Sequence, residues 1–217
     1  MNANIEQQLI LNRYFVQSFL GQGGMARVYR VFDQQRQVVL ALKLLHTDLA
    51  HDRVFLRRFR REAQTLAQLQ HPHIVRFFGF EEAGRLAFLL MEYIAGESLK
   101  TYIFDANGPL SPPEIRAIFQ PVCAALHFAH QMGYVHCDIK PGNIMIEHSG
   151  RVLVNDFGIA RLSETATATM VGLGTPAYMA PEQIQGLDPT PQTDIYALGI
   201  ILFELLTGGE RPFTGEQ

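Results

Sequence analysis

The first half of the chain alternates short apolar stretches with polar or glycine-containing breaks. The stretches are rich in β-branched and aromatic residues, which fit the pleated, half-buried surface of a sheet. The breaks contain glycine or the polar run Asp-Gln-Gln, which are typical of turns between strands. This pattern predicts five strands, at residues 14–20, 26–32, 38–45, 74–80 and 86–93.

One segment of this half, residues 52–70, has helical periodicity instead. Its apolar face is predicted to hold Phe55, Phe59, Leu66 and Leu69. Glu62 falls on the same face, where an unpaired buried carboxylate is costly. Lys43 has the same difficulty inside an apolar strand, so we expect the two side chains to pair. The alternative is that each side chain extends along the apolar surface to reach water.

After residues 94–97 the pattern becomes mostly helical. Helices are predicted at residues 98–104, 113–132 and 192–207, with short strands at 144–147 and 151–154. The chain therefore divides into a β-rich part with one helix, residues 1–93, and a mainly helical part, residues 94–217. The last helix is apolar nearly all round, which is typical of a helix at the centre of a core.

Composition and charge exclude several classes of function. The 217 residues are 47% hydrophobic, enough for a sizeable core, and the net charge of −3 gives no attraction to nucleic acid or membranes. The two cysteines, Cys123 and Cys137, form no CxxC pair, which favours a reducing, cytoplasmic setting. The first residues do not resemble a signal peptide, and no apolar run is long enough to span a bilayer.

The strongest candidate chemistry lies in residues 136–143 and in Asp156–Gly158. Asp138 is suited to accept a hydroxyl proton, and Lys140 to neutralise charge on a transferred phosphoryl group. Asn143 and Asp156 offer the hard oxygen ligands that Mg²⁺ prefers. Together these groups suit the binding of a nucleoside triphosphate with its metal beside a hydroxyl nucleophile.

A second candidate element is the glycine-rich segment Gly21–Val28. Gly21, Gly23 and Gly24, which flank and follow Gln22, allow the backbone to approach phosphate groups because no Cβ intervenes. Taken alone, this segment is equally well explained as an ordinary hairpin turn.

The order of these motifs resembles that of eukaryotic-like Ser/Thr protein kinases, from about Tyr14 to Phe213. The residues within the motifs are most similar to those of the bacterial branch of that family. The resemblance rests on the glycine-rich segment, Ala41–Lys43, Arg61–Ala63, the catalytic loop with Asp156–Gly158, Gly174–Glu182 and Asp194–Gly199. It implies an α+β bilobal fold with a β-rich nucleotide-binding lobe and a mainly helical lobe. It also implies ATP with Mg²⁺ or Mn²⁺, and a protein substrate bearing a Ser or Thr hydroxyl.

The resemblance also implies individual roles. Asp138 is the base, whereas His136 packs against Phe157; Lys43, paired with Glu62, contacts the α- and β-phosphates. In the nucleotide site, Val28 and Ala41 form the roof, Met145 the floor, Met91 the gatekeeper, and Glu92 to Ile94 the hinge that binds adenine. Ala26 replaces the third glycine of the family pattern.

Two features depart from the family. Cys137 replaces the arginine that receives an activation-loop phosphate, although Thr165, Thr167 and Thr169 remain candidate phosphorylation sites in that loop. About ten residues follow the last helix, so we expect its outer helices to be missing or replaced by another polypeptide, and Glu182 to lack its family arginine. The alternatives to an active kinase are an inactive nucleotide-binding or scaffold fragment and, less well supported by Gly174–Glu182, a small-molecule phosphotransferase.

Overall fold

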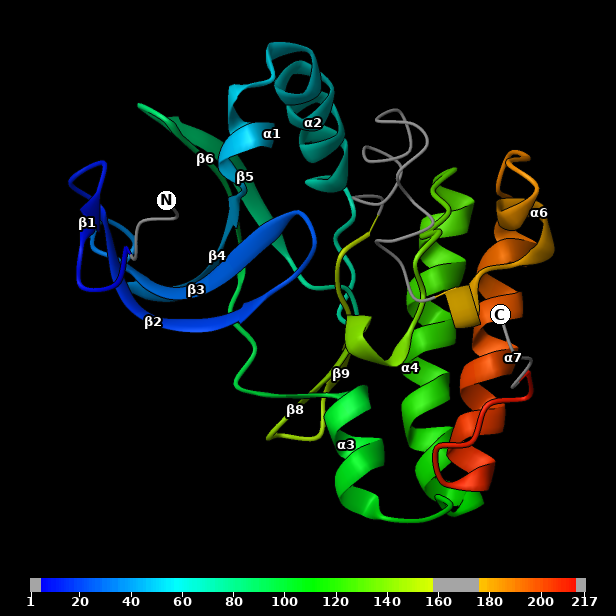
Figure 1. Cartoon of the computed structure of the whole chain (residues 1–217). Helices are drawn as coiled ribbons and strands as arrows, with labels where there is room; N and C mark the ends of the chain where they lie inside the picture. Colours follow the sequence, from blue (N-terminus) through cyan, green and yellow to red (C-terminus); the bar gives the residue numbers. More distant parts are fainter. Residues whose placement is uncertain (1–4, 158–175, 214–217) are drawn as a thin grey trace. The chain divides into compact units, whose positions relative to one another are not determined.

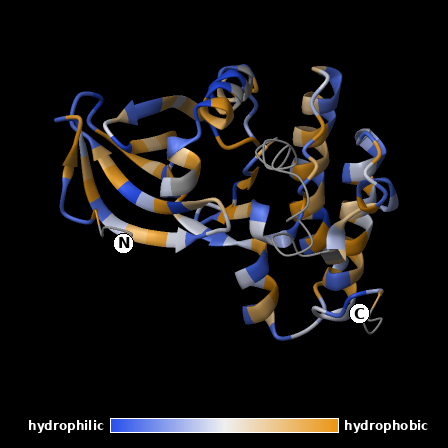
Figure 2. Cartoon of the chain, turned by 45° about the horizontal axis from the view of Figure 1, so that its top comes forward, coloured by the Kyte–Doolittle hydropathy of each residue, from blue (hydrophilic) through white to orange (hydrophobic). Residues whose placement is uncertain are grey.

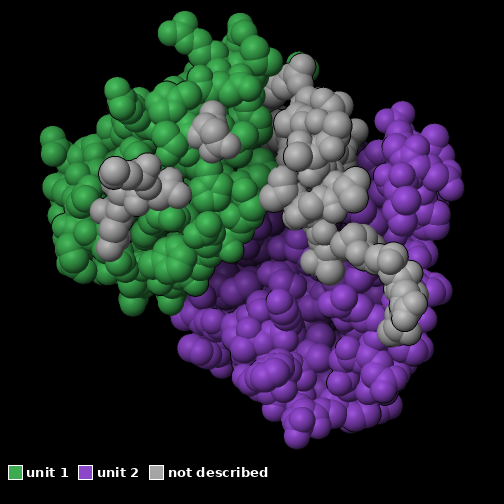
Figure 3. Space-filling view, viewed as in Figure 1, with its two compact units in different colours: residues 1–70, 76–93 green, residues 71–75, 94–217 purple. Residues whose placement is uncertain are grey.

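The computed structural model describes residues 5–157 and 176–213, without the side chains of Asp48, Arg58, Glu62, Thr65 and Pro176. The chain forms two compact units, coloured separately in Figure 3. Unit 1 consists of residues 1–70 and 76–93, and unit 2 of residues 71–75 and 94–217. The first unit thus ends at Tyr93, and the short segment 71–75 folds with the second unit.

Unit 1 is built on an antiparallel sheet with the strand order β1-β2-β3-β4-β6-β5, visible as the curled blue-to-green ribbon in Figure 1. The strands are β1 (Leu9–Ile10), β2 (Tyr14–Gln22), β3 (Ala26–Asp33), β4 (Val38–Leu45), β5 (Phe77–Ala83) and β6 (Leu86–Glu92). Its core is closed by apolar residues with almost no exposed surface, among them Tyr14, Val16, Val31, Leu42 and Phe88. The periodicity of the sequence predicted this sheet apart from β1, which is too short to have a pattern.

Two helices belong to unit 1, α1 (Thr47–His51) and α2 (Arg53–Leu66). The Asp52 carboxylate accepts the N–H groups of Val54 and Phe55 and so satisfies donors at the start of α2. Phe59 is buried between the rings of Phe55 and Phe80, at centroid distances of 5.4 and 5.5 Å. The predicted amphipathic helix is therefore present, although it ends at Leu66 instead of residue 70.

The predicted strand at residues 74–80 is divided between the two units. Ile74 forms a parallel bridge with Val154, and the Val75 N–H donates to the Val154 carbonyl, so this end pairs within unit 2. Strand β5 begins only at Phe77 and pairs with β6 in unit 1. The division falls at the exposed Arg76, but the apolar residues on both sides of it follow one another as they would in a single strand.

Unit 2 contains a small sheet of β7 (Gly96–Ser98), β8 (Ile144–Glu147) and β9 (Val152–Val154). Its helices are α3 (Leu99–Ala106), α4 (Pro112–Gln131), α6 (Pro181–Ile184) and α7 (Pro191–Thr207), with 3-10 turns at Pro141–Asn143 and Pro176–Tyr178. Strand β7 escaped prediction because it is only three residues long and begins with a glycine. That glycine is required, since a Cβ at Gly96 would overlap the carbonyl oxygen of Ile146.

Helices α4 and α7 lie side by side in unit 2 (Figure 1), and α7 is largely apolar (Figure 2). One face of α7 is buried through residues such as Ala197, Ile201 and Leu205. Its other face exposes Ile195 and Leu206 by 59% and 51%, so within the described residues only part of this apolar helix is covered. No helix in the described ranges is long and apolar enough to cross a membrane.

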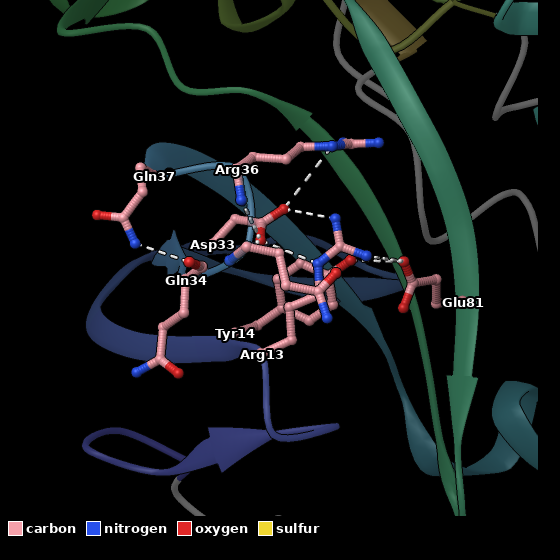
Figure 4. A network of polar contacts seen from close by, with 8 residues as sticks. Arg13, Tyr14, Asp33, Gln34, Arg36, Gln37 and Glu81 are labelled. Carbon is pink, nitrogen blue, oxygen red and sulfur yellow. Dashed lines mark hydrogen bonds and ion pairs between the residues drawn. The ribbon is translucent and has the colours of Figure 1, made fainter.

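Figure 4 shows an ion pair of unit 1 between Arg13, which precedes β2, and the buried Asp33 at the end of β3. The Arg13 guanidinium donates to both carboxylate oxygens of Asp33, at 2.9 and 2.7 Å, and Asp33 has no exposed surface. Asp33 also accepts the N–H groups of Gln35 and Arg36, which closes the turn into β4. The hydrogen bonds from Arg13 lower the pKa of Asp33 below its usual value, against the opposing effect of burial.

Candidate active site

The loop that contains Asp138 is held by hydrogen bonds to Asp194, which lies in the first turn of α7. The Asp194 carboxylate is 1% exposed and accepts the backbone N–H groups of His136 and Cys137, each at 2.9 Å. It also lies 2.7 Å from Nε2 of His130 on α4. These bonds fix the backbone immediately before Asp138 in one conformation. They support the left-handed conformation of Cys137, whose φ of 67° is unfavourable for a residue other than glycine.

His136 is occupied by structural contacts, as the sequence predicted. Its Nε2 lies 2.8 Å from the carbonyl of Asn155, which can only accept, so Nε2 carries a proton. Its Nδ1 accepts the N–H of Asp138 and is therefore unprotonated. The imidazole is neutral, fully buried and packed against Phe157 at a centroid distance of 4.6 Å. It has no nitrogen left to act as a general base.

The carboxylate of Asp138 is engaged by two neighbours in the same loop. Nζ of Lys140 donates to both carboxylate oxygens, at 2.9 and 2.7 Å. Nδ2 of Asn143 donates to Oδ2 at 3.0 Å and to the Asp138 backbone carbonyl at 2.7 Å. The structure therefore brings together three of the predicted site residues, with the acid oriented by a cation and an amide.

Asn143 and Asp156 fit a hard divalent cation by the chemistry of their donor atoms. Because Nδ2 of Asn143 is directed to Asp138, its amide oxygen is the atom left for a metal. The Asn143 carbonyl accepts the N–H of Asn155, which joins this turn to the residue before Asp156. Asp156 has a φ of 61°, a left-handed conformation that is uncommon outside turns and functional sites.

Cys137 lies at the position where the resemblance to protein kinases implies an arginine, and its side chain is a small buried thiol. The side chain points back into the loop, where the S–H donates to the carbonyl of Val135 at 3.4 Å. The Cys137 carbonyl accepts Nε2 of Gln183 from α6, at 2.8 Å. The candidate phosphorylation sites Thr165, Thr167 and Thr169, like Gly158, Gly174 and Thr175, lie outside the described residues.

The predicted nucleotide-binding residues of unit 1 share one face of its sheet. Val28 is directly opposite Lys43 in the β3–β4 register, and Ala41 is directly opposite Met91 in the β4–β6 register. Directly paired residues project to the same face, as do residues two apart on one strand, so all four side chains share it. The side chain of Glu62 is outside the described part of the chain, so its pairing with Lys43 stays a prediction. The remaining predicted contacts are Glu92 at the end of β6, and Ile94 and Met145 in unit 2.

A second polar cluster links the 3-10 turn at Pro176–Tyr178 to α7. The Tyr178 hydroxyl lies 2.7 and 2.8 Å from the two carboxylate oxygens of Glu204, and Arg211 pairs with the same carboxylate at 3.2 Å. Burial, followed by the bond to Glu204, raises the pKa of Tyr178. Glu182 accepts a hydrogen bond from the Thr193 hydroxyl, which lowers the pKa of that carboxyl. Among the described residues, Arg211 pairs with Glu204 rather than with Glu182.

Sequence reasoning missed Asp194 and His130 as supports of the catalytic loop. The available signal was an acidic residue at the start of an otherwise apolar helix, since a buried acid requires hydrogen-bond donors. The identity of those donors depends on tertiary contacts between residues 57 and 58 positions apart in sequence.

Comparison with known proteins defines the class. The protein kinase domain family matches residues 14–217, and the chain belongs to this family. It is 47% identical over 210 residues to the serine/threonine-protein kinase PrkC of Bacillus subtilis, and 42% identical over 214 residues to PknB of Mycobacterium tuberculosis. These matches cover 96% and 95% of the chain and 32% and 34% of the relatives, so it spans about a third of their length.

Solved structures support the same assignment. The crystal structure of the M. tuberculosis PknI kinase domain superposes with a TM-score of 0.78 at 30% identity. The match covers 99% of this chain and 82% of that domain. The predicted bilobal kinase fold is therefore confirmed.

Proposed function

We propose that the chain is a serine/threonine protein kinase catalytic region that transfers the γ-phosphoryl group of ATP to a hydroxyl of a protein. The observation that supports this most directly is the environment of Asp138. The hydrogen bonds from Lys140 and Asn143 hold this carboxylate in one orientation, as an acceptor for a hydroxyl proton requires. Lys140 would neutralise charge that develops on the transferred group.

We assign nucleotide binding mainly to unit 1, through the backbone of the glycine-rich segment and the sheet face that carries Val28, Ala41, Lys43 and Met91. Glu62 would orient Lys43 toward the phosphates, and Glu92, Ile94 and Met145 would contact the base. A divalent cation, which we propose to be Mg²⁺, would be held by Asn143 and Asp156 and would neutralise phosphate charge. Within the described residues neither Cys123 nor Cys137 is part of a disulfide, which supports a proposed cytoplasmic location.

The proposed activity is tested by incubating the purified chain with labelled ATP, Mg²⁺ and a generic basic protein. Asp138→Ala and Asp156→Ala should each reduce transfer by at least ~100-fold, about 2.7 kcal/mol of activation free energy. Asp105→Ala, at an exposed aspartate of α3, is the matched control and should transfer at the parent rate. Nucleotide binding without transfer by the parent chain would instead identify an inactive nucleotide-binding protein.

A further inference from the structure

The glycine-rich loop between β2 and β3 is held by the residue that follows β4. Within the loop, the Gly23 N–H donates to the Ala26 carbonyl at 2.8 Å. Two other loop carbonyls face His46, which directly follows Leu45 and lies three residues after Lys43. The His46 N–H donates to the Met25 carbonyl at 2.9 Å, and its ring Nε2 lies 3.2 Å from the Gly23 carbonyl.

The direction of the side-chain bond follows from its acceptor. A carbonyl oxygen cannot donate, so Nε2 of His46 must carry a proton. The contact with Met25 continues the β3–β4 ladder, in which Ala26 is opposite Leu45, and any residue except proline could make it from position 46. The contact with Gly23 instead depends on a side chain of the right length with a donor at its end.

This second bond fixes a peptide plane that sterics leave free. A Cβ at Gly23 would meet no atom closer than 3.9 Å, so packing does not restrict the backbone there, and glycine has wide conformational freedom. In a trans peptide the C=O and N–H groups point in opposite directions. With the Gly23 carbonyl turned to His46, the N–H of Gly24 is turned away from it.

We propose that His46 is a positioning residue for the nucleotide: by binding the Gly23 carbonyl it keeps the glycine-rich loop in the conformation that receives phosphate groups. The inference rests on the proposed kinase function, and it concerns binding of the nucleotide rather than phosphoryl transfer. His46 does not touch the reacting atoms. Its loss should therefore weaken ATP binding and leave the chemical step unchanged.

Three substitutions separate the hydrogen bond from the size of the side chain. In His46→Gln the side-chain amide nitrogen takes approximately the place of Nε2, so the donor is retained. In His46→Asn the amide is one carbon closer to the backbone and cannot reach Gly23, and His46→Ala has no donor. The backbone bond to Met25 persists in all three. His51→Ala is the matched control, because the His51 ring bonds the Thr47 carbonyl within α1.

Binding is measured by titrating each protein with a fluorescent ATP analogue, in an Asp138→Ala background that does not turn it over. Loss of one such hydrogen bond should weaken binding about fivefold in His46→Ala and His46→Asn, whereas His46→Gln and His51→Ala should bind within about twofold of the parent. In steady-state assays of the active chain, His46→Ala and His46→Asn should raise KM for ATP and leave kcat unchanged.

Equal binding by all variants, or a His46→Gln protein as weak as His46→Ala, would overturn the proposal. A fall in kcat with unchanged KM would also overturn it. If the parent binds ATP but transfers no phosphate, the kinase function fails while the role of His46 is still decided by the titration. A parent that binds no ATP overturns both.

Discussion

Among the described side chains, each compact unit contains one almost fully buried aspartate, and the two aspartates differ in the groups that bind their carboxylates. Asp33 in unit 1 faces the guanidinium of Arg13 in a two-bond ion pair. Asp194 in unit 2 faces two backbone N–H groups and the imidazole of His130. Among the described residues, no Lys or Arg forms an ion pair with Asp194.

The difference indicates two purposes for a buried carboxylate. The partners of Asp33 are the side chain at the start of β2 and the turn before β4, so its bonds stabilise the sheet. Two of the partners of Asp194 belong to the loop that carries Asp138, so its bonds determine where this proposed catalytic base lies. Both carboxylates accept two backbone N–H groups, but only Asp33 also faces a guanidinium. We therefore assign Asp33 to the stability of the sheet and Asp194 to the position of the loop.

The largest effect is expected when Asp194 loses one acceptor. In Asp194→Asn the new NH2 group would face the backbone N–H of His136 or of Cys137. Both groups are hydrogen-bond donors, so that hydrogen bond would be lost. The loop should shift, and small displacements of catalytic groups cost on the order of 100-fold in rate. We expect kcat to fall by about that factor with little change in KM for ATP.

Asp188→Asn provides the matched control, since this aspartate precedes α7 by only three residues and is exposed. It should have the parent kcat. An Asp194→Asn protein with nearly normal kcat would show that the catalytic loop keeps its geometry without Asp194, and the contrast with Asp33 would then be wrong.

Asp33→Asn should instead reduce stability and leave kcat nearly unchanged. Loss of a charged hydrogen-bonded pair with Arg13 should lower the free energy of unfolding by about 2 kcal/mol. Transfer per folded molecule should stay within about twofold of the parent, because no contact of Asp33 reaches the catalytic loop. Urea titration followed by circular dichroism measures the first quantity, with Asp105→Asn as an exposed control. A reduced kcat with unchanged stability would reverse the assigned purposes of the two residues.

The same contrast shows what the sequence can predict. Strand β4 and helix α7 were predicted nearly to the residue, because their apolar patterns are long and their ends are marked by polar residues. Asp138, Lys140 and Asn143 were predicted to act together because they lie in a motif that resembles the catalytic loop of protein kinases. The partners of Asp33 and Asp194 were not predictable, since each pairing joins distant segments and depends on the register between elements.

The smallest effect is a pH dependence of stability that belongs to Asp33 alone. Its pKa is lowered in the folded protein, chiefly by the bonds from Arg13, whereas an unfolded aspartate titrates near ~3.9. The ion pair therefore contributes its full stability above about pH 5, and this contribution is lost as pH falls through the folded-state pKa. The gap in unfolding free energy between the parent and Asp33→Asn should accordingly narrow on acidification, by at most about 1.4 kcal/mol per pH unit. Comparing the two proteins cancels the titration of every other group. The measurement covers roughly pH 6 to pH 3, a window of about three units that includes the unfolded value. A difference in unfolding free energy that stays constant over this window would show that Arg13 does not depress the pKa of Asp33.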